Sequence, residues 1–190
     1  MAYIELNNPL PGITGLLENR KDTAAPIREL TQILLRGEST LTELERELIA
    51  TIVSFRNQCR YCTNAHGATV IALGGSQELL NHIYQDPEKA GLGEKMKALL
   101  AIAARTQESG KSVKEEHIRR AKNAGATDIE IHDTVLIAAL FCLYNRYVDG
   151  LGTYCPADPA YYQKLASRLV TTGYESPKDP GVRKGEESFK

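Results

Sequence analysis

One short segment limits the possible folds of this chain more than any other, because helical spacings separate its four chemically active side chains. On a single helix, Cys59, Cys62 and His66 lie within about 60° of one another. Glu47 would stand about 18 Å from Cys59 on that same helix, at about 1.5 Å per residue. The apolar periodicity lapses at residues 56–58, so we expect the chain to reverse there. In the resulting antiparallel helical hairpin, Glu47 lies opposite His66.

This reversal predicts a site suited to thiol chemistry. Both cysteines then lie in the first turn of the second helix, where unpaired backbone N–H groups and the helix dipole favour a thiolate. Glu47 can orient the imidazole of His66, and His66 can take the proton of a thiol directly or through a water. Cys62 lies nearer to His66 along the helix, which favours Cys62 as the activated thiol and Cys59 as its disulfide partner. The reverse assignment is the alternative.

Apolar residues recur at helical spacing along almost the whole chain, and strand signals are nearly absent. The sequence therefore predicts an all-α protein. We expect an irregular N-terminal arm over residues 1–24, one helical domain over residues 25–173 and a C-terminal tail over residues 174–190. Apparent capping boxes mark three helix starts, at Thr42–Glu45, Ser112–Glu115 and Thr127–Glu130. Helices are expected to start near residues 25, 42, 58, 77, 94, 112, 127 and 158.

Charge and composition argue against several functional classes. The 23 basic and 24 acidic residues of the 190-residue chain balance, which disfavours a nucleic-acid or anionic-membrane partner. The longest apolar stretch, residues 135–143, is too short to span a bilayer. We find no secretory signal in the first residues and expect a cytoplasmic protein with four reduced cysteines. There, a Cys-x-x-Cys pair is more often catalytic or metal-binding than a structural crosslink.

Two alternative interpretations of the cysteine pair need no redox chemistry. The cysteines could be core residues of an amphipathic helix. They could instead hold a structural zinc ion together with His66 and a fourth ligand from elsewhere in the chain. None of the candidates for that ligand belongs to a second cluster with metal-ligand spacing. The candidates are Cys142, Cys155, His82, His117 and His132.

Three further residues are candidate pocket residues. Tyr61 lies between the two cysteines and either lines the pocket or packs in the core. Asn145 and Arg146 form a polar pair inside an apolar helix, where burial is costly unless the polar groups are paired. We expect this pair to bond to the cysteine hairpin or across a subunit interface, with a solvent-facing position as the alternative. Cys142 is expected to be a buried, inert thiol.

The pattern Glu47, eleven residues, Cys59-Arg60-Tyr61-Cys62, three residues, His66 resembles the AhpD-like alkyl hydroperoxidases of the carboxymuconolactone decarboxylase superfamily. Segments 125–133 and 145–152 are similar to its longer, peroxidase-related branch, so the resemblance covers about residues 25–169. It implies a helical bundle without a bound cofactor, assembled as a dimer, trimer or hexamer. It also implies reduction of organic hydroperoxides with electrons from an external dithiol donor, of lipoyl or thioredoxin-like type.

The resemblance also implies roles for the residues of the motif. Glu47 and His66 match the proton relay, Cys62 matches the peroxidatic thiol and Cys59 matches the resolving thiol. Tyr61 stands where better-studied members carry a histidine, so proton delivery is expected to differ here. Members that decarboxylate a lactone lack the cysteine pair. The sequence thus predicts a thiol-dependent peroxidase, with a dithiol–disulfide adaptor or a zinc-holding binding protein as alternatives.

Overall fold

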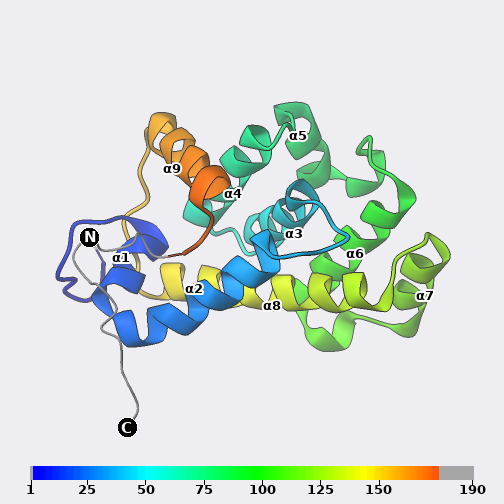
Figure 1. Ribbon diagram of the computed structural model, residues 1–190, viewed down its shortest axis with the longest axis horizontal. Helices are drawn as coiled ribbons and strands as arrows, with labels where there is room; N and C mark the ends of the chain where they lie inside the picture. The colour runs from blue at the N-terminus through cyan, green and yellow to red at the C-terminus, as the bar shows by residue number, and fades with distance from the viewer. Residues whose placement is uncertain (1, 176–190) are drawn as a thin grey trace, which may run out of the picture.

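The computed structural model describes residues 2–175, and within that range it contains nine α-helices, two short 3₁₀ turns and no strand (Figure 1). The prediction of an all-α fold is confirmed. In the described part, no helix is both long enough and apolar enough to span a bilayer. The helices are α1 (Gly12–Asn19), α2 (Lys21–Arg36), α3 (Glu43–Arg56), α4 (Arg60–Ala72), α5 (Gln77–Gln85), α6 (Glu94–Glu108), α7 (Glu115–Asn123), α8 (Asp128–Gly150) and α9 (Pro159–Thr172).

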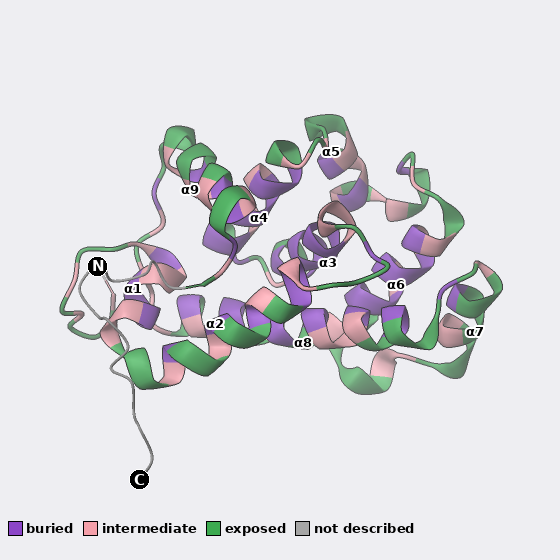
Figure 2. Cartoon of the chain, in the orientation of Figure 1, coloured by how far each residue is buried: buried purple, intermediate pink, exposed green. Residues whose placement is uncertain are grey.

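Helix α3 forms the centre of the molecule, because it packs against α4, α6 and α8. Nine consecutive residues of α3, from Arg46 to Ser54, are buried, and the inner faces of the surrounding helices are buried around it (Figure 2). Helix α8 runs along the length of the molecule, with α2 beside part of it, and α9 packs against α4 (Figure 1). Helix α3 therefore places several polar side chains in the core, among them Glu47 and Ser54, which have no exposed surface.

Two of the three expected capping boxes are confirmed, and the third is wrong. Thr42 with Glu45 and Thr127 with Glu130 form reciprocal caps at the starts of α3 and α8. Ser112 instead belongs to the 3₁₀ turn Gly110–Ser112, which precedes α7. At the start of α7, Nδ1 of His117 accepts a hydrogen bond from the N–H of Lys114. The histidine thus takes the role that the Ser112 pattern suggested for a glutamate.

The N-terminal segment contains more helix than expected. Residues 1–24 were expected to be irregular, but they include α1 and the beginning of α2. Leu16 and Leu17 of α1 are buried against the rest of the protein, and this packing outweighs the local effect of the neighbouring glycines and prolines. Helix α2 starts at Lys21, so Pro26 lies in its second turn rather than its first. Tyr174 packs into the molecule, whereas the rest of the expected tail, residues 176–190, lies outside the described residues.

Candidate active site

The chain reverses between α3 and α4, as the sequence predicts. Gln58 adopts a left-handed conformation with φ of 59°, and Cys59 is the N-cap of α4. The N–H of Cys59 donates to the carbonyl oxygen of Ser54, which closes the turn at 3.1 Å. The reversal brings Glu47 opposite His66, with Oε2 of the carboxylate 2.7 Å from Nδ1 of the imidazole.

Three groups surround the carboxylate of Glu47, which has no exposed surface. Oε2 contacts His66, whereas Oε1 accepts hydrogen bonds from Nη2 of Arg36 at 2.7 Å and from the hydroxyl of Tyr174 at 2.5 Å. Burial alone would raise the pKa of Glu47, but His66, Arg36 and Tyr174 outweigh it and hold this pKa below its ordinary value. Glu47 is therefore a buried, ionised group with both oxygens bonded.

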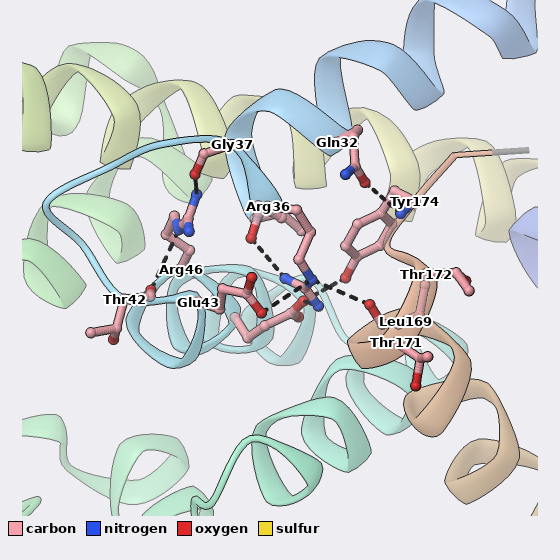
Figure 3. A network of polar contacts seen from close by, with 12 residues as sticks. Gln32, Arg36, Gly37, Thr42, Glu43, Arg46, Leu169, Thr171, Thr172 and Tyr174 are labelled. Carbon is pink, nitrogen blue, oxygen red and sulfur yellow. Dashed lines mark hydrogen bonds and ion pairs between the residues drawn. The ribbon is translucent and has the colours of Figure 1, made fainter.

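Arg36 and Tyr174 hold each other as well as Glu47. Figure 3 shows the guanidinium of Arg36 between the end of α9 and the Tyr174 ring, whose centroid lies 5.0 Å from Cζ. Nε of Arg36 donates to the carbonyl oxygen of Leu169. Gly173 turns the chain here with φ of 67°, and a Cβ atom at this position would lie 2.3 Å from the side chain of Gln32. Burial, and then the charge of Glu47, raise the pKa of Tyr174 well above its ordinary value.

The second ring nitrogen of His66 remains available for chemistry. Nδ1 is held by Glu47, and Nε2 makes no hydrogen bond to any other residue between 2 and 175. The ring of Phe141 packs edge-on against the imidazole, with centroids 4.5 Å apart. A carboxylate on one ring nitrogen selects the tautomer whose other nitrogen carries the lone pair. Nε2 of His66 can therefore accept a proton.

Cys59 and Cys62 are both free thiols, and both are buried, with 0% and 2% of their surface exposed. The neighbouring thiol of Cys59, followed by burial, raises the pKa of Cys62 well above its ordinary value, while a hydrogen bond with Asn145 acts in the opposite direction. This shift is opposite to the one expected from the helix N-terminus alone. Cys62 therefore rests as a neutral thiol and needs a base when it reacts.

A chain of neutral side chains surrounds the turn beside the cysteines. Nδ2 of Asn57 donates to Oδ1 of Asn145 at 2.8 Å, and Nδ2 of Asn145 donates to Oγ of Ser54 at 3.1 Å. Gln107 donates to Oδ1 of Asn57 at 2.9 Å. Of the expected polar pair, Asn145 is thus buried and bonded to the hairpin. Arg146 is exposed and bonds to the carbonyl oxygen of its own helix, so it does not belong to this site.

A cavity of about 60 Å³ lies beside Cys62 and His66. Residues of α1, α2, α4, α8 and α9 form its walls, together with the segment that follows α9. Apolar side chains, three phenols and two arginines line it, and no acidic side chain does. The lining residues are Ile13, Thr14, Leu17, Arg28, Tyr61, Cys62, Ala65, His66, Tyr144, Leu165, Arg168, Leu169 and Tyr174.

Tyr61 is a wall of this cavity, and 2% of its surface is exposed. Its hydroxyl lies 3.0 Å from the hydroxyl of Tyr161, and burial followed by that neighbour raises its pKa well above the ordinary value. Its ring lies against Gly12, where a Cβ atom would come within 2.3 Å of the ring carbons. Tyr61 therefore shapes the cavity, and its phenol is a poor proton donor.

The remaining cysteines and histidines do not join this site as ligands. Within residues 2–175, no three His, Cys, Asp or Glu side chains gather in a way that could hold a metal ion. Cys142 is half-buried and accepts a hydrogen bond from Asn57 at 3.5 Å, whereas Cys155 contacts the hydroxyl of Tyr162. The zinc interpretation of the cysteine pair gains no support from this arrangement.

Sequence reasoning missed two residues that contact Glu47. Arg36 looked only like a helix end before Gly37, and Tyr174 was placed in the tail. The sequence did contain one signal for Arg36, because a cation in the last turn of one helix can face a buried carboxylate on the next helix. Tyr174 offered a weaker signal, an aromatic residue directly after a glycine that ends a helix.

Comparison with known proteins agrees with this architecture. Residues 21–105 and 79–152 match the carboxymuconolactone decarboxylase family. A peroxidase-related protein from Silicibacter sp. is 27% identical, with a TM-score of 0.72 over 80% of this chain and 78% of that one. A peroxidase-related protein with an alkylhydroperoxidase AhpD core, from Ralstonia eutropha, is 25% identical, with a TM-score of 0.73 over 83% of this chain and 81% of that one.

Sestrin-3 of Mus musculus is also similar, at 24% identity over 152 residues. The match covers 80% of this chain but only 26% of sestrin-3, so the chain spans about a quarter of that relative. The family match spans α2 to α8, the part of the chain that carries Glu47, Cys62 and His66. This chain therefore belongs to the carboxymuconolactone decarboxylase family, in its AhpD-like, peroxidase-related branch.

Proposed function

We propose that this protein is a thiol-dependent peroxidase in which Cys62 attacks an organic hydroperoxide. One observation carries the proposal: Glu47 holds His66 at 2.7 Å, and His66 lines the same cavity as Cys62. The peroxidase-related proteins with this fold support the same chemical class. The site has a base, a thiol and an enclosed space for a small substrate.

The first step transfers two electrons from sulfur to the peroxide. Nε2 of His66 takes the proton of Cys62, and the thiolate attacks the distal oxygen of the hydroperoxide. The O–O bond breaks, an alcohol leaves after taking a proton from the imidazolium, and Cys62 becomes a sulfenic acid. Glu47 stabilises the imidazolium while it carries the proton.

The second step closes a disulfide and regenerates the enzyme. The Cys59 thiol attacks the sulfur of the Cys62 sulfenic acid, and water leaves. An external dithiol then reduces this disulfide, becoming a disulfide itself and returning both thiols to the protein. A lipoyl group or a thioredoxin-like protein fits this role, and the burial of both cysteines favours the slender lipoyl group. The protein itself needs no bound cofactor in this scheme.

Counting thiols before and after one equivalent of tert-butyl hydroperoxide, a small organic hydroperoxide, tests the proposal. A Cys142→Ser, Cys155→Ser background leaves only the two cysteines in question, and we expect both to be lost per chain. A protein that keeps both thiols after exposure is not a peroxidase of this kind. Metal analysis of protein purified without chelator is the control, since stoichiometric zinc would contradict the redox role.

A dithiol–disulfide adaptor is the second candidate, because the same thiol pair could reduce a partner protein. Burial of Cys59 and Cys62 disfavours a bulky protein disulfide as the substrate. Rates of thiol oxidation by tert-butyl hydroperoxide and by a disulfide-bonded protein, compared at equal concentration, separate the two functions. Faster oxidation by the protein disulfide would favour the adaptor.

We also propose that the chain assembles into a homo-oligomer. Leu30 and Ile33 are exposed on the outer face of α2, and Ile129 and Leu143 are exposed on α8. Faces of this kind are common where copies of a chain pack together. Light scattering at micromolar concentration should give a mass above that of one chain, 20.9 kDa.

A further inference from the structure

The guanidinium of Arg28 is the most unusual polar group outside the relay. Arg28 lies on α2, only 8% of its surface is exposed, and it lines the cavity that Cys62 and His66 share. One nitrogen, Nη2, donates to Oε1 of Glu18 at 2.7 Å. Nε is buried and has no hydrogen-bond partner among residues 2–175. Buried donors are normally satisfied, so this wall of the cavity is short of acceptor atoms.

The charges around the cavity also favour a ligand that brings acceptor atoms. Its lining contains Arg28 and Arg168 but no carboxylate. Arg168 is half-buried on α9 and forms no ion pair within the described part of the chain. Glu18 balances Arg28, and Arg36 and Glu47 balance each other behind His66. One positive charge therefore remains uncompensated at the cavity, which suits a singly charged anion.

The lining of the cavity combines two kinds of polar group. Cys62 and His66 are the reactive side chains, and Arg28 supplies unused N–H donors. Leu165, Leu169 and Ile13 provide apolar surface in the same lining. The volume of about 60 Å³ suits a short chain that extends partly out of the cavity mouth, and it leaves no room to enclose a long one.

We propose that this cavity binds a short organic hydroperoxide that carries a carboxylate, with Arg28 holding the carboxylate and Cys62 meeting the hydroperoxide. Guanidinium groups bind carboxylates through paired, charge-assisted hydrogen bonds, which matches a group with several free N–H donors. The proposal rests on the proposed peroxidase function and adds the class of substrate. Arg168 contributes charge at the same cavity without being buried.

A matched pair of substrates tests the proposal. The two are 5-hydroperoxypentanoate and its methyl ester, and the readout is the rate of disulfide formation at increasing substrate concentration. We expect the wild-type protein to prefer the acid. Arg28→Leu should raise the KM for the acid about tenfold or more and leave the KM for the ester within about twofold. An equal change for both substrates, or no change for either, would overturn the role of Arg28.

Removing the partner of Arg28 should have the opposite effect. Glu18→Gln leaves the guanidinium without its balancing charge, so the KM for the acid should fall severalfold while the ester is unaffected. Arg120→Leu is the matched control, because Arg120 pairs with Glu88 on the surface and does not line the cavity. A Glu18→Gln protein that binds the acid more weakly contradicts the proposal.

Binding to the unmodified protein keeps the test independent of both folding and catalysis. Calorimetry with pentanoate, pentanamide and inorganic phosphate needs neither a variant nor turnover, and we expect pentanoate to bind at least about tenfold more tightly than the other two. Equal binding of pentanoate and pentanamide, or tighter binding of phosphate, would overturn the proposal. If pentanoate binds but neither hydroperoxide oxidises the thiols, the anion site stands and the peroxidase function fails.

Discussion

At one end of the α3–α4 hairpin, Glu47 and His66 lie in a network of charges, whereas at the turn the hydrogen bonds join neutral side chains and a carboxylate beside the cysteines, Asp149, contacts Cys59. The charged end is held by Arg36 and Tyr174. The turn is held by Asn57, Asn145 and Ser54, which are polar but uncharged.

The difference separates two tasks. Charges fix the protonation state of a group, so they belong where Glu47 must stay ionised beside His66. Neutral amides fix positions without a fixed charge, and the hydrogen bond from Asn145 favours the thiolate of Cys62. The turn can therefore stay in place while the cysteines change between thiol, thiolate and disulfide. Substitutions at the charged end and at the turn should therefore differ in their effects on stability and on activity.

The largest effect is expected at the sulfur atoms themselves. Cys62→Ser should lower peroxide turnover by about 10³-fold or more, because the hydroxyl is a far weaker nucleophile. Cys59→Ser should keep a single turnover and lose recycling, which quenched-flow thiol counting can measure. Full turnover by Cys62→Ser would assign the attack to Cys59 instead.

The charged end should be next in sensitivity. Glu47→Gln leaves the buried guanidinium of Arg36 with only the half-exposed Glu43 as a counter-ion, so we expect a loss of about 3–5 kcal/mol in unfolding free energy. Peroxide turnover should also fall about 10²-fold, because His66 loses the group that stabilises its proton. Chemical denaturation and initial rates measure the two losses.

Glu43→Gln is the control for this variant, because Glu43 contacts the same guanidinium at 3.5 Å but is half-exposed. Glu43→Gln should lower the free energy of unfolding by less than about 1 kcal/mol. Equal losses from the two variants would show that burial of Glu47 has no special role.

Lowering the pH should change the stability contribution of the charged end of the hairpin but not that of the turn. The pKa of Glu47 is depressed, so its contribution to stability is present above the ordinary value of 4.5 and is lost as the pH falls through the folded-state pKa. The stability gap between wild type and Glu47→Gln should therefore shrink as the pH drops below 4.5. A variant of the neutral turn, Asn57→Ala, should show a constant gap over the same range. Urea denaturation at several pH values provides the comparison.

Tyr174→Phe should have a smaller effect than Glu47→Gln, because Arg36 still holds Oε1 of the carboxylate. Losing one hydrogen bond to a charged group costs about 1.5–3 kcal/mol in stability, and turnover should fall about tenfold. Tyr154→Phe is the control, since Tyr154 is 60% exposed. A Tyr174→Phe protein with wild-type activity would make Tyr174 a packing residue only.

The smallest change in activity is expected at the turn. Asn57→Ala removes the donor to Oδ1 of Asn145 and the acceptor for Gln107, and it should cost about 1–3 kcal/mol in stability. Turnover at saturating hydroperoxide should change by less than about threefold, since no charge is removed. Asn81→Ala is the control, because it removes an exposed hydrogen bond on α5 and should leave both stability and turnover unchanged. A collapse of activity in Asn57→Ala without unfolding would place the turn inside the chemistry.

Features that depend on neighbouring residues could be read from the sequence. The caps at Thr42 and Thr127 are formed within three residues, and the reversal near Asn57 follows from where the apolar period lapses. The pairing of Glu47 with His66 spans only 19 residues and follows from that reversal. These parts of the fold and site were predictable because local geometry decides them.

Features that depend on distant packing could not be read in the same way. Tyr174 reaches Glu47 across 127 residues of sequence, and no periodicity marks such a contact. Helix α1 forms among glycines and prolines because Leu16 and Leu17 are buried against other helices. Arg146 appeared equivalent to Asn145, but a helix turns by about 100° per residue, and the two point to different sides. Only the packed structure separates them.

The position of Tyr174 has a consequence for the order in which the protein becomes active during synthesis. The 108 residues from His66 to Tyr174 take about 5 to 20 s to be translated. During most of that interval the nascent chain already carries Cys59 and Cys62, but α9 and the residue that completes the shell around Glu47 have not yet been made. A partly made chain thus presents two thiols without their full burial or their full relay. Its cysteines stay accessible to other thiols and to oxidants until the last helix docks.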